Sequence, residues 1–135
     1  MQRLKSTVVN TYVLTQKVLT NNINITKVEG KPVKLLYVDE RTFWTTREII
    51  SNGTTKEGVP LEVFKGEFDG LIDVGAHIGI YSVLMGALNA DVNLFVYEPA
   101  NAPQEILKKN LELNGLRERA SVEQNIVAGS SGRSE

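Results

Sequence analysis

Apolar and polar positions divide the chain into two parts with different patterns, on either side of a polar stretch with two glycines at residues 52–58. Small polar residues of this kind cannot sustain an apolar face, so they predict a loop. After the loop, apolar runs with strand character alternate with helical runs. The expected strands cover residues 70–74, 92–97 and 120–128, and the expected helices cover residues 80–88 and 101–113. This alternation predicts an α/β fold in which helices flank a sheet of three parallel strands.

The sequence before the loop has a weaker and more mixed pattern. It predicts a loosely spaced helix, a β-hairpin with its turn at residues 29–32, and a second short helix, over residues 4–20, 23–38 and 42–50. We therefore expect a small α+β segment at residues 1–57, followed by the main α/β unit at residues 58–135.

Two features of the main unit indicate burial. The helix expected at residues 80–88 is apolar all round except for a serine and a glycine, so it must pack against other elements. The strand at residues 92–97 is also almost continuously apolar, which suits a sheet covered on both faces. In the next helix, Asn101 and Gln104 predict a capping box at the start, and the Asn114-Gly115 pair predicts the end.

Composition and charge restrict the classes of function. A chain of 135 residues suits one domain with one hydrophobic core. The 15 Lys and Arg residues against 16 Asp and Glu residues form no basic stripe, so we do not expect nucleic acid as a partner. The chain has no cysteine and one histidine, His77, so we expect neither disulfides nor a bound metal. The sequence shows no signal peptide and no membrane-spanning run, so we expect a cytoplasmic protein that does not contact membranes.

The main chemical signal lies where the first strand of the main unit meets its first helix. Asp73 is near the end of the strand, Gly75 and Gly79 follow in the turn, and Glu98 ends the next strand. Gly75 lets the backbone turn sharply and approach a ligand, while Gly79 permits close helix packing. A carboxylate at the end of the second strand can accept hydrogen bonds from both hydroxyls of an adenosine ribose. Separately, these residues fit any strand-to-helix turn and any solvated strand end, but together they favour a nucleotide-like ligand.

The same residues resemble the motifs of one enzyme family. Residues 71–82 (Leu-Ile-Asp-Val-Gly-Ala-His-Ile-Gly-Ile-Tyr-Ser) are similar to the first motif of FkbM-family methyltransferases, and residues 96–99 (Val-Tyr-Glu-Pro) are similar to the second. Residues 107–116 resemble the helix and turn that follow, and residues 125–129 resemble the third strand and its exit. The resemblance covers residues 70–132, about half of the chain. It implies a partial Rossmann-like methyltransferase sheet and S-adenosyl-L-methionine as the cofactor.

The resemblance also implies which residues bind the cofactor. The first turn and the acid before it would lie near the methionyl and ribose portion, Glu98 would bind the ribose hydroxyls, and the end of the third strand would lie beside the adenine. The expected cofactor-binding residues are Asp73, Gly75, Ala76, His77, Ile78, Gly79, Glu98, Pro99, Asn125 and Ile126. For Asn125 and Ile126, an ordinary buried strand end is an equally good interpretation. His77 stands where the family often has asparagine, and we expect it to make a polar or structural contact rather than to catalyse.

The catalytic part of such a domain has no counterpart in this sequence. A complete class I methyltransferase resembles a seven-stranded sheet, of which we expect the first three strands here, and no residue matches the acidic motif of the fourth strand. We therefore name no catalytic residue. The resemblance implies a small-molecule acceptor, such as a hydroxyl of a sugar or another metabolite. We expect the base to come from a missing C-terminal half or a complementary chain, and the 135-residue chain alone to be inactive, whether it is truncated, split or a remnant.

Two other classes of function stay open. One is a non-catalytic module that binds the cofactor or a partner chain, because a half sheet exposes an edge and a face that a complete domain covers. The other is a fragment of a nicotinamide-dependent dehydrogenase, in which an acid also ends the second strand. Its usual G-x-G-x-x-G fingerprint needs a glycine where this chain has His77, so the dehydrogenase is the weaker alternative.

Overall fold

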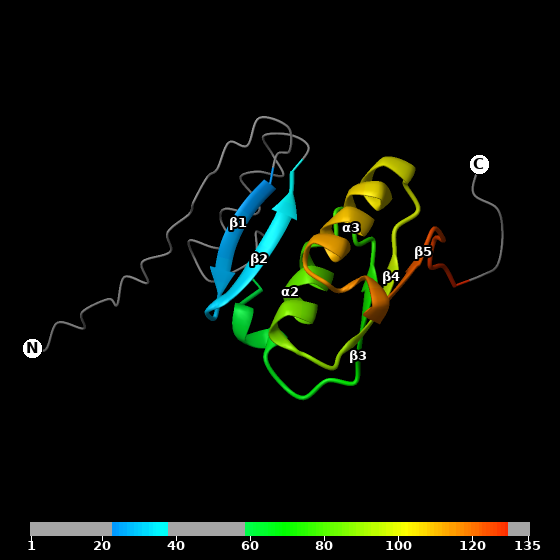
Figure 1. Ribbon diagram of the computed structural model, residues 1–135. Helices are drawn as coiled ribbons and strands as arrows, with labels where there is room; N and C mark the ends of the chain where they lie inside the picture. The colour runs from blue at the N-terminus through cyan, green and yellow to red at the C-terminus, as the bar shows by residue number, and fades with distance from the viewer. Residues whose placement is uncertain (1–22, 38–58, 130–135) are drawn as a thin grey trace, which may run out of the picture.

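The computed structural model describes residues 23–37 and 59–129, which form three layers. A β-hairpin lies on one side, two helices lie in the middle, and a three-stranded sheet lies on the other side (Figure 1). In chain order the elements are β1 (Ile23–Val28), β2 (Lys31–Leu36), the 3-10 helix η1 (Leu61–Phe64), β3 (Gly70–Val74), α2 (Ile80–Leu88), β4 (Asn93–Tyr97), α3 (Asn101–Leu113), the 3-10 helix η2 (Arg117–Arg119) and β5 (Ala120–Glu123).

The sheet confirms the predicted α/β, Rossmann-like architecture. Its strands are all parallel and lie in the order β3-β4-β5. The third strand is shorter than expected, because it ends at Glu123 rather than at residue 128. The reason is the register: Glu123 pairs with Tyr97, the last residue of β4, so the chain beyond Glu123 finds no β4 backbone to continue the ladder.

Both helices lie on the same face of this sheet (Figure 1). The connections β3-α2-β4 and β4-α3-β5 step across the sheet in the same direction, and right-handed crossovers then place both helices on one side. Leu94 and Val96 of β4 point to the helices and are buried, whereas Phe95 between them is half-exposed on the other face. The apolar pattern of residues 92–97 predicted that other elements would cover both faces of the sheet. Among the described residues, only the face toward α2 and α3 is covered.

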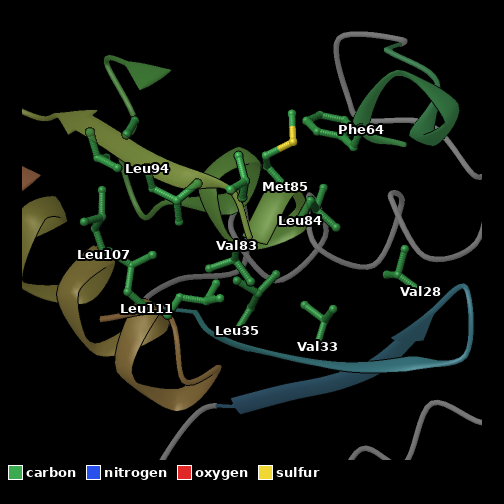
Figure 2. Close-up of a cluster of buried hydrophobic side chains, with 14 of the residues drawn as sticks. Val28, Val33, Leu35, Phe64, Val83, Leu84, Met85, Leu94, Leu107 and Leu111 are labelled. Carbon is green, nitrogen blue, oxygen red and sulfur yellow. The ribbon is translucent and has the colours of Figure 1, made fainter. Parts of the chain in front are cut away.

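The predicted hairpin is confirmed and belongs to the same hydrophobic core as the helices, but its turn is shorter than residues 29–32, because Lys31 and Pro32 belong to β2. Glu29 and Gly30 form a two-residue turn with φ of 51° and 78°, the left-handed conformation that such turns require. Val33 and Leu35 are the buried residues of β2, and both belong to the core cluster that includes α2 and α3. Leu35 lies beside Val83 of α2 and Leu111 of α3 (Figure 2). The hairpin is thus a packed layer and closes the helices on the side away from the sheet.

The ends of the helices follow from the sequence in part. The predicted bounds of α2 are confirmed, and Asn114-Gly115 ends α3 as expected, with Gly115 at φ 66°. The capping box at the start of α3 was wrong. The N-cap is Ala100, whose carbonyl accepts the backbone N–H of Gln104, and no side chain caps this end.

The C-terminal end of α2 has a partner that the sequence pattern did not indicate. The guanidinium of Arg119 donates to the carbonyls of Gly86 at 2.9 Å, Asn89 at 3.0 Å and Val92 at 3.2 Å. These carbonyls belong to the last turn of α2, where a positive charge is favourable, and to the two ends of the connection that leads to β4. Arg119 therefore fixes the connection from α2 to β4.

The remaining predictions for the N-terminal part lie outside the described residues. These are the helices at residues 4–20 and 42–50 and the loop at residues 52–58. The proposed boundary between residues 57 and 58 also falls there, so it stays a prediction.

Candidate functional site

The three parallel strands end at one edge of the sheet, and the turns that follow them form the candidate site. The residues after β3 are Gly75–Gly79, those after β4 are Glu98–Ala100, and those after β5 start at Gln124. In parallel α/β sheets, ligands bind at the carboxyl ends of the strands. The sequence-predicted cofactor residues belong to this edge, with Asp73 one residue before the end of β3.

The turn between β3 and α2, which we call the glycine loop (residues 75–79), is held tightly by the end of β4. The backbone N–H groups of Gly75 and Ala76 both donate to the carbonyl of Tyr97, at 2.9 Å and 3.1 Å. Three residues of the loop have positive φ: Gly75 at 72°, His77 at 52° and Gly79 at 81°. A histidine in this region is uncommon, and the position is one that asparagine or glycine occupies more easily.

The two glycines of the loop have different surroundings. A Cβ atom on Gly79 would lie 3.0 Å from the Cγ of Leu107, so the glycine lets α3 approach the start of α2, as the sequence predicted. A Cβ atom on Gly75 would meet no atom within 4 Å. The space beside Gly75 is therefore open at the edge where a ligand is expected.

Glu98 lies directly against the glycine loop. Its side chain is 6% exposed, and its two oxygens accept the backbone N–H groups of His77 at 2.7 Å and Ala100 at 2.9 Å. The carboxylate thus joins the turn after β3 to the turn after β4. Each carboxylate oxygen has a second lone pair and can accept a further donor. The residue predicted to bind a ribose therefore lies beside the loop predicted to bind the rest of the ligand.

Asp73 is buried below the loop, on the face of the sheet that carries the helices. Its Oδ2 accepts the hydroxyl of Ser82 at 2.6 Å, and the backbone N–H of Ser82 also bonds to this carboxyl group. Burial raises the pKa of Asp73, the two bonds from Ser82 oppose the rise, and the negative charge of Glu98 adds to it. Ser82 lies in the first turn of α2, so Asp73 caps that helix from a neighbouring strand.

The residues after β5 are exposed. Gln124 donates to the carbonyl of Pro99 at 3.3 Å and to the side chain of Asn101, which ties this segment to the turn after β4. Asn125 and Ile126 follow, and Ile126 is 56% exposed. The alternative interpretation of Asn125 and Ile126 as a buried strand end was wrong, because β5 ends before them. Their place beside an adenine stays a prediction.

Sequence reasoning missed three polar residues that shape this edge. Gln104 is buried and donates to the backbone carbonyl of Glu98 at 3.1 Å. Ser82 holds Asp73, and the fully buried Asn110 donates to the carbonyl of Ile78 at 2.7 Å. Ser82 had a visible signal, since it is the polar interruption of an otherwise apolar helix. The sequence signal for Gln104 and Asn110 was weaker: each is a polar residue on the apolar face of α3, beside Leu107 or Leu111.

The described residues contain no group of three or more His, Asp or Glu side chains arranged to hold a metal ion. None of the helices in residues 23–37 and 59–129 is long and apolar enough to cross a membrane. A hollow of about 620 Å³ lies at the opposite edge of the sheet, lined by residues 66–69 and 88–92, and is remote from the glycine loop.

Comparison with known proteins identifies the fold. The sequence matches no family model and is significantly similar to no curated protein. Among solved structures, P. horikoshii TYW2 in complex with MeSAdo is 18% identical, with a TM-score of 0.50 over 79% of this chain and 37% of that chain. M. jannaschii TYW2 in complex with AdoMet is 17% identical, with a TM-score of 0.45 over 80% of this chain and 44% of that one. The StiE O-MT is 22% identical, with a TM-score of 0.43 over 57% of this chain.

The chain spans 26% to 44% of the length of these solved structures. The match to the P. horikoshii protein covers most of the present chain, whose described part combines helices with a three-stranded parallel sheet. The described residues therefore have the Rossmann-like fold found in methyltransferases.

Proposed function

We propose that this chain is the cofactor-binding part of a class I methyltransferase that uses S-adenosyl-L-methionine. The observation that carries the proposal is the contact of Glu98 with His77, because it places an acidic strand end and a glycine loop at one point on the sheet edge. The fold supports it, and the P. horikoshii protein with this fold was solved in complex with MeSAdo. A dehydrogenase is disfavoured by His77, which occupies the place of the middle glycine of the dinucleotide fingerprint.

The geometry suggests how the residues share the work of binding. Glu98 uses its remaining lone pairs to accept the two ribose hydroxyls, while the hydrogen bonds from the N–H groups of His77 and Ala100 hold the carboxylate in place. The open space beside Gly75 receives the cofactor. Asp73 acts indirectly, since its carboxyl is committed to Ser82, and Asn125 and Ile126 border the adenine.

The finer assignment rests on the resemblance to the FkbM family. It implies a hydroxyl of a sugar or another small metabolite as the methyl acceptor. The cofactor would supply the methyl group: as the acceptor oxygen attacked in line, the sulfur–methyl bond would break, S-adenosylhomocysteine would leave, and a base would take the hydroxyl proton. Catalysis would come mainly from positioning, with a base that the described residues do not supply. These residues provide one wall of a cofactor cleft, and an open half-site binds more weakly than a preorganised one. We expect the 135-residue chain to bind the cofactor weakly and to transfer no methyl group.

The test is an NMR titration of the 135-residue chain with S-adenosylhomocysteine, which detects weak binding. We expect the amide signals of Gly75, His77 and Gly79 to shift. Glu98→Ala should weaken binding by about 1.5 to 3 kcal/mol, the usual value of hydrogen bonds to a charged group. Glu123→Ala is the matched control, because this glutamate ends β5 at the same edge and is exposed.

A second ligand separates loss of the ribose contact from disturbance of the loop. Wild-type protein should prefer S-adenosylhomocysteine to its 2′,3′-dideoxy analogue, and Glu98→Ala should remove that preference. If both proteins showed the same preference, the ribose hydroxyls would not bind Glu98. If millimolar ligand shifts no loop amide, the cofactor proposal fails. Tight binding without methyl transfer to hydroxylated acceptors would instead favour a non-catalytic cofactor-binding module.

A further inference from the structure

The side chain of Asn110 connects the hairpin to the glycine loop through the middle layer of the molecule. It is fully buried in α3. Its Oδ1 accepts the backbone N–H of Leu36 at 2.6 Å, and its Nδ2 donates to the carbonyl of Ile78 at 2.7 Å. Leu36 ends β2 and Ile78 belongs to the glycine loop, so one amide group bonds to two segments far apart in the sequence.

The contact with Ile78 complements the one made by Glu98. Glu98 holds the N–H of His77 from the end of β4, and Asn110 holds the carbonyl of the next residue from α3. Ile78 lies between two residues with positive φ, His77 and Gly79, a backbone conformation that persists when its surroundings fix it. A buried carbonyl that loses its donor is also costly. Asn110 therefore stabilises the strained side of the loop.

The contact with Leu36 shows that the hairpin and α3 are matched in spacing. Asn114, one turn after Asn110, exchanges two hydrogen bonds with Lys34, accepting its N–H at 2.9 Å and donating to its carbonyl at 2.6 Å. Four helical residues rise about 6 Å and two strand residues about 6.6 Å, so the two asparagines can serve alternate residues of a strand edge. The next alternate position on that edge is Pro32, which has no N–H to satisfy.

We propose that Asn110 is a positioning residue through which docking of the hairpin sets the conformation of the glycine loop, and with it the affinity for S-adenosylmethionine. The second half of this statement rests on the proposed function, whereas the first half does not. Leu36 orients the amide of Asn110 by donating to its oxygen, which leaves the nitrogen directed at Ile78. The side chain of Asn114 bonds to the backbone of Lys34 and to the carbonyl of Asn110 rather than to the loop, so it serves as the internal control.

The first measurement is amide hydrogen exchange of the 135-residue chain without ligand. In Asn110→Ala, the amides of residues 77–80 should exchange at least tenfold faster relative to those of β4. In Asn114→Ala, the hairpin amides should exchange faster while residues 77–80 stay within about twofold of wild type. Equal acceleration of the loop in both variants would show a general loss of stability and would overturn the proposal.

The second measurement is the Kd for S-adenosylhomocysteine. Asn110→Ala should raise it about tenfold, and Asn114→Ala should change it less than twofold. If the wild-type chain binds no cofactor, the proposed function fails, and the exchange experiment still tests the loop. If the loop is loosened but Kd is unchanged in Asn110→Ala, the link from loop conformation to affinity is wrong.

A second pair of variants covers the case in which Asn110→Ala does not fold. Leu36→Pro removes the N–H that Asn110 accepts, and Lys34→Pro removes the N–H that Asn114 accepts, both on a strand edge that already holds Pro32. Leu36→Pro should loosen residues 77–80 and Lys34→Pro should not. The reverse order, or no difference between them, would show that the hairpin does not act on the loop through Asn110.

Discussion

The two faces of the β3-β4-β5 sheet are built from alternate residues of the same strands, yet their surroundings differ. On the face toward α2 and α3, Leu94 is 1% exposed and Val96 is completely buried. On the opposite face, Ile72 of β3 is 70% exposed and Val74 of β3 is 55% exposed, although isoleucine and valine are as apolar as the buried leucine and valine of β4. An apolar strand pattern therefore indicates which residues suit burial but does not say which element of the described chain buries them.

The difference also separates stability from function along the same strands. The covered face holds the core that fixes the helices, and the loops at its carboxyl edge take their geometry from that core through Gly79, Glu98 and Asn110. The side chains on the opposite face take no part in these three contacts. Changes on the two faces should thus have distinct consequences.

The largest expected effect comes from truncating neighbouring residues of β4. Leu94→Ala should lower the free energy of unfolding by about 3 kcal/mol, because it leaves a cavity between the sheet and the helices. Phe95→Ala should cost about 1 kcal/mol or less, although it removes more atoms, because the ring is 46% exposed. Urea unfolding of both variants gives the comparison. Equal losses would mean that the opposite face is covered in solution.

Much of this architecture could be predicted from local sequence, and the failures have a common cause. The bounds of α2 follow from an apolar run that begins after Gly79, and the end of α3 follows from Asn114-Gly115, because both signals act within a few residues. The end of β5 depends on where β4 stops. Gln104 was assigned to a local cap, but its side chain bonds to the backbone of Glu98 instead. Contacts between distant segments decide these cases, and no local pattern encodes them.

The candidate site shows the same division. The glycine loop and Glu98 were recognisable because their residue types and spacing suit a ligand at a strand end. The commitment of Asp73 to Ser82 could not be read, since it requires knowing that the start of α2 lies over the carboxyl end of β3. The roles of Asn110 and Asn114 required the position of the hairpin on α3.

A smaller effect is expected from Asp73, the charged exception on the covered face. Burial raises its pKa above 3.8 in the folded state, so the folded protein binds this proton more readily than the unfolded chain. Ionised Asp73 therefore costs stability, and that cost grows as the pH rises from about 3.8 through the raised pKa. Asp73→Asn keeps an acceptor for Ser82 and removes the charge, so it should be more stable than wild type at neutral pH.

Thermal unfolding of Asp73→Asn and wild type across the acid range tests this sign. The advantage of the variant should shrink as the pH falls through the raised pKa of Asp73, and it should be lost below about 3.8, where Asp73 is protonated in both states. The exposed Asp69, just before the same strand, supplies the matched control Asp69→Asn, which makes the same substitution at the surface. An advantage that increases toward acid pH would contradict the assignment of desolvation as the dominant cause.

The smallest effect on stability should come from the opposite face. The double variant Ile72→Thr and Val74→Thr keeps β-branched side chains, which suit a strand, and makes a surface that is already exposed more polar. The free energy of unfolding should change by less than about 0.5 kcal/mol, as for most surface substitutions. Sedimentation velocity at rising concentration should show less self-association than in wild type, because an exposed apolar sheet face promotes it. A loss above about 1.5 kcal/mol, with the same monomer mass in both proteins, would mean that another part of this chain covers the face, and the contrast between the two faces would no longer hold.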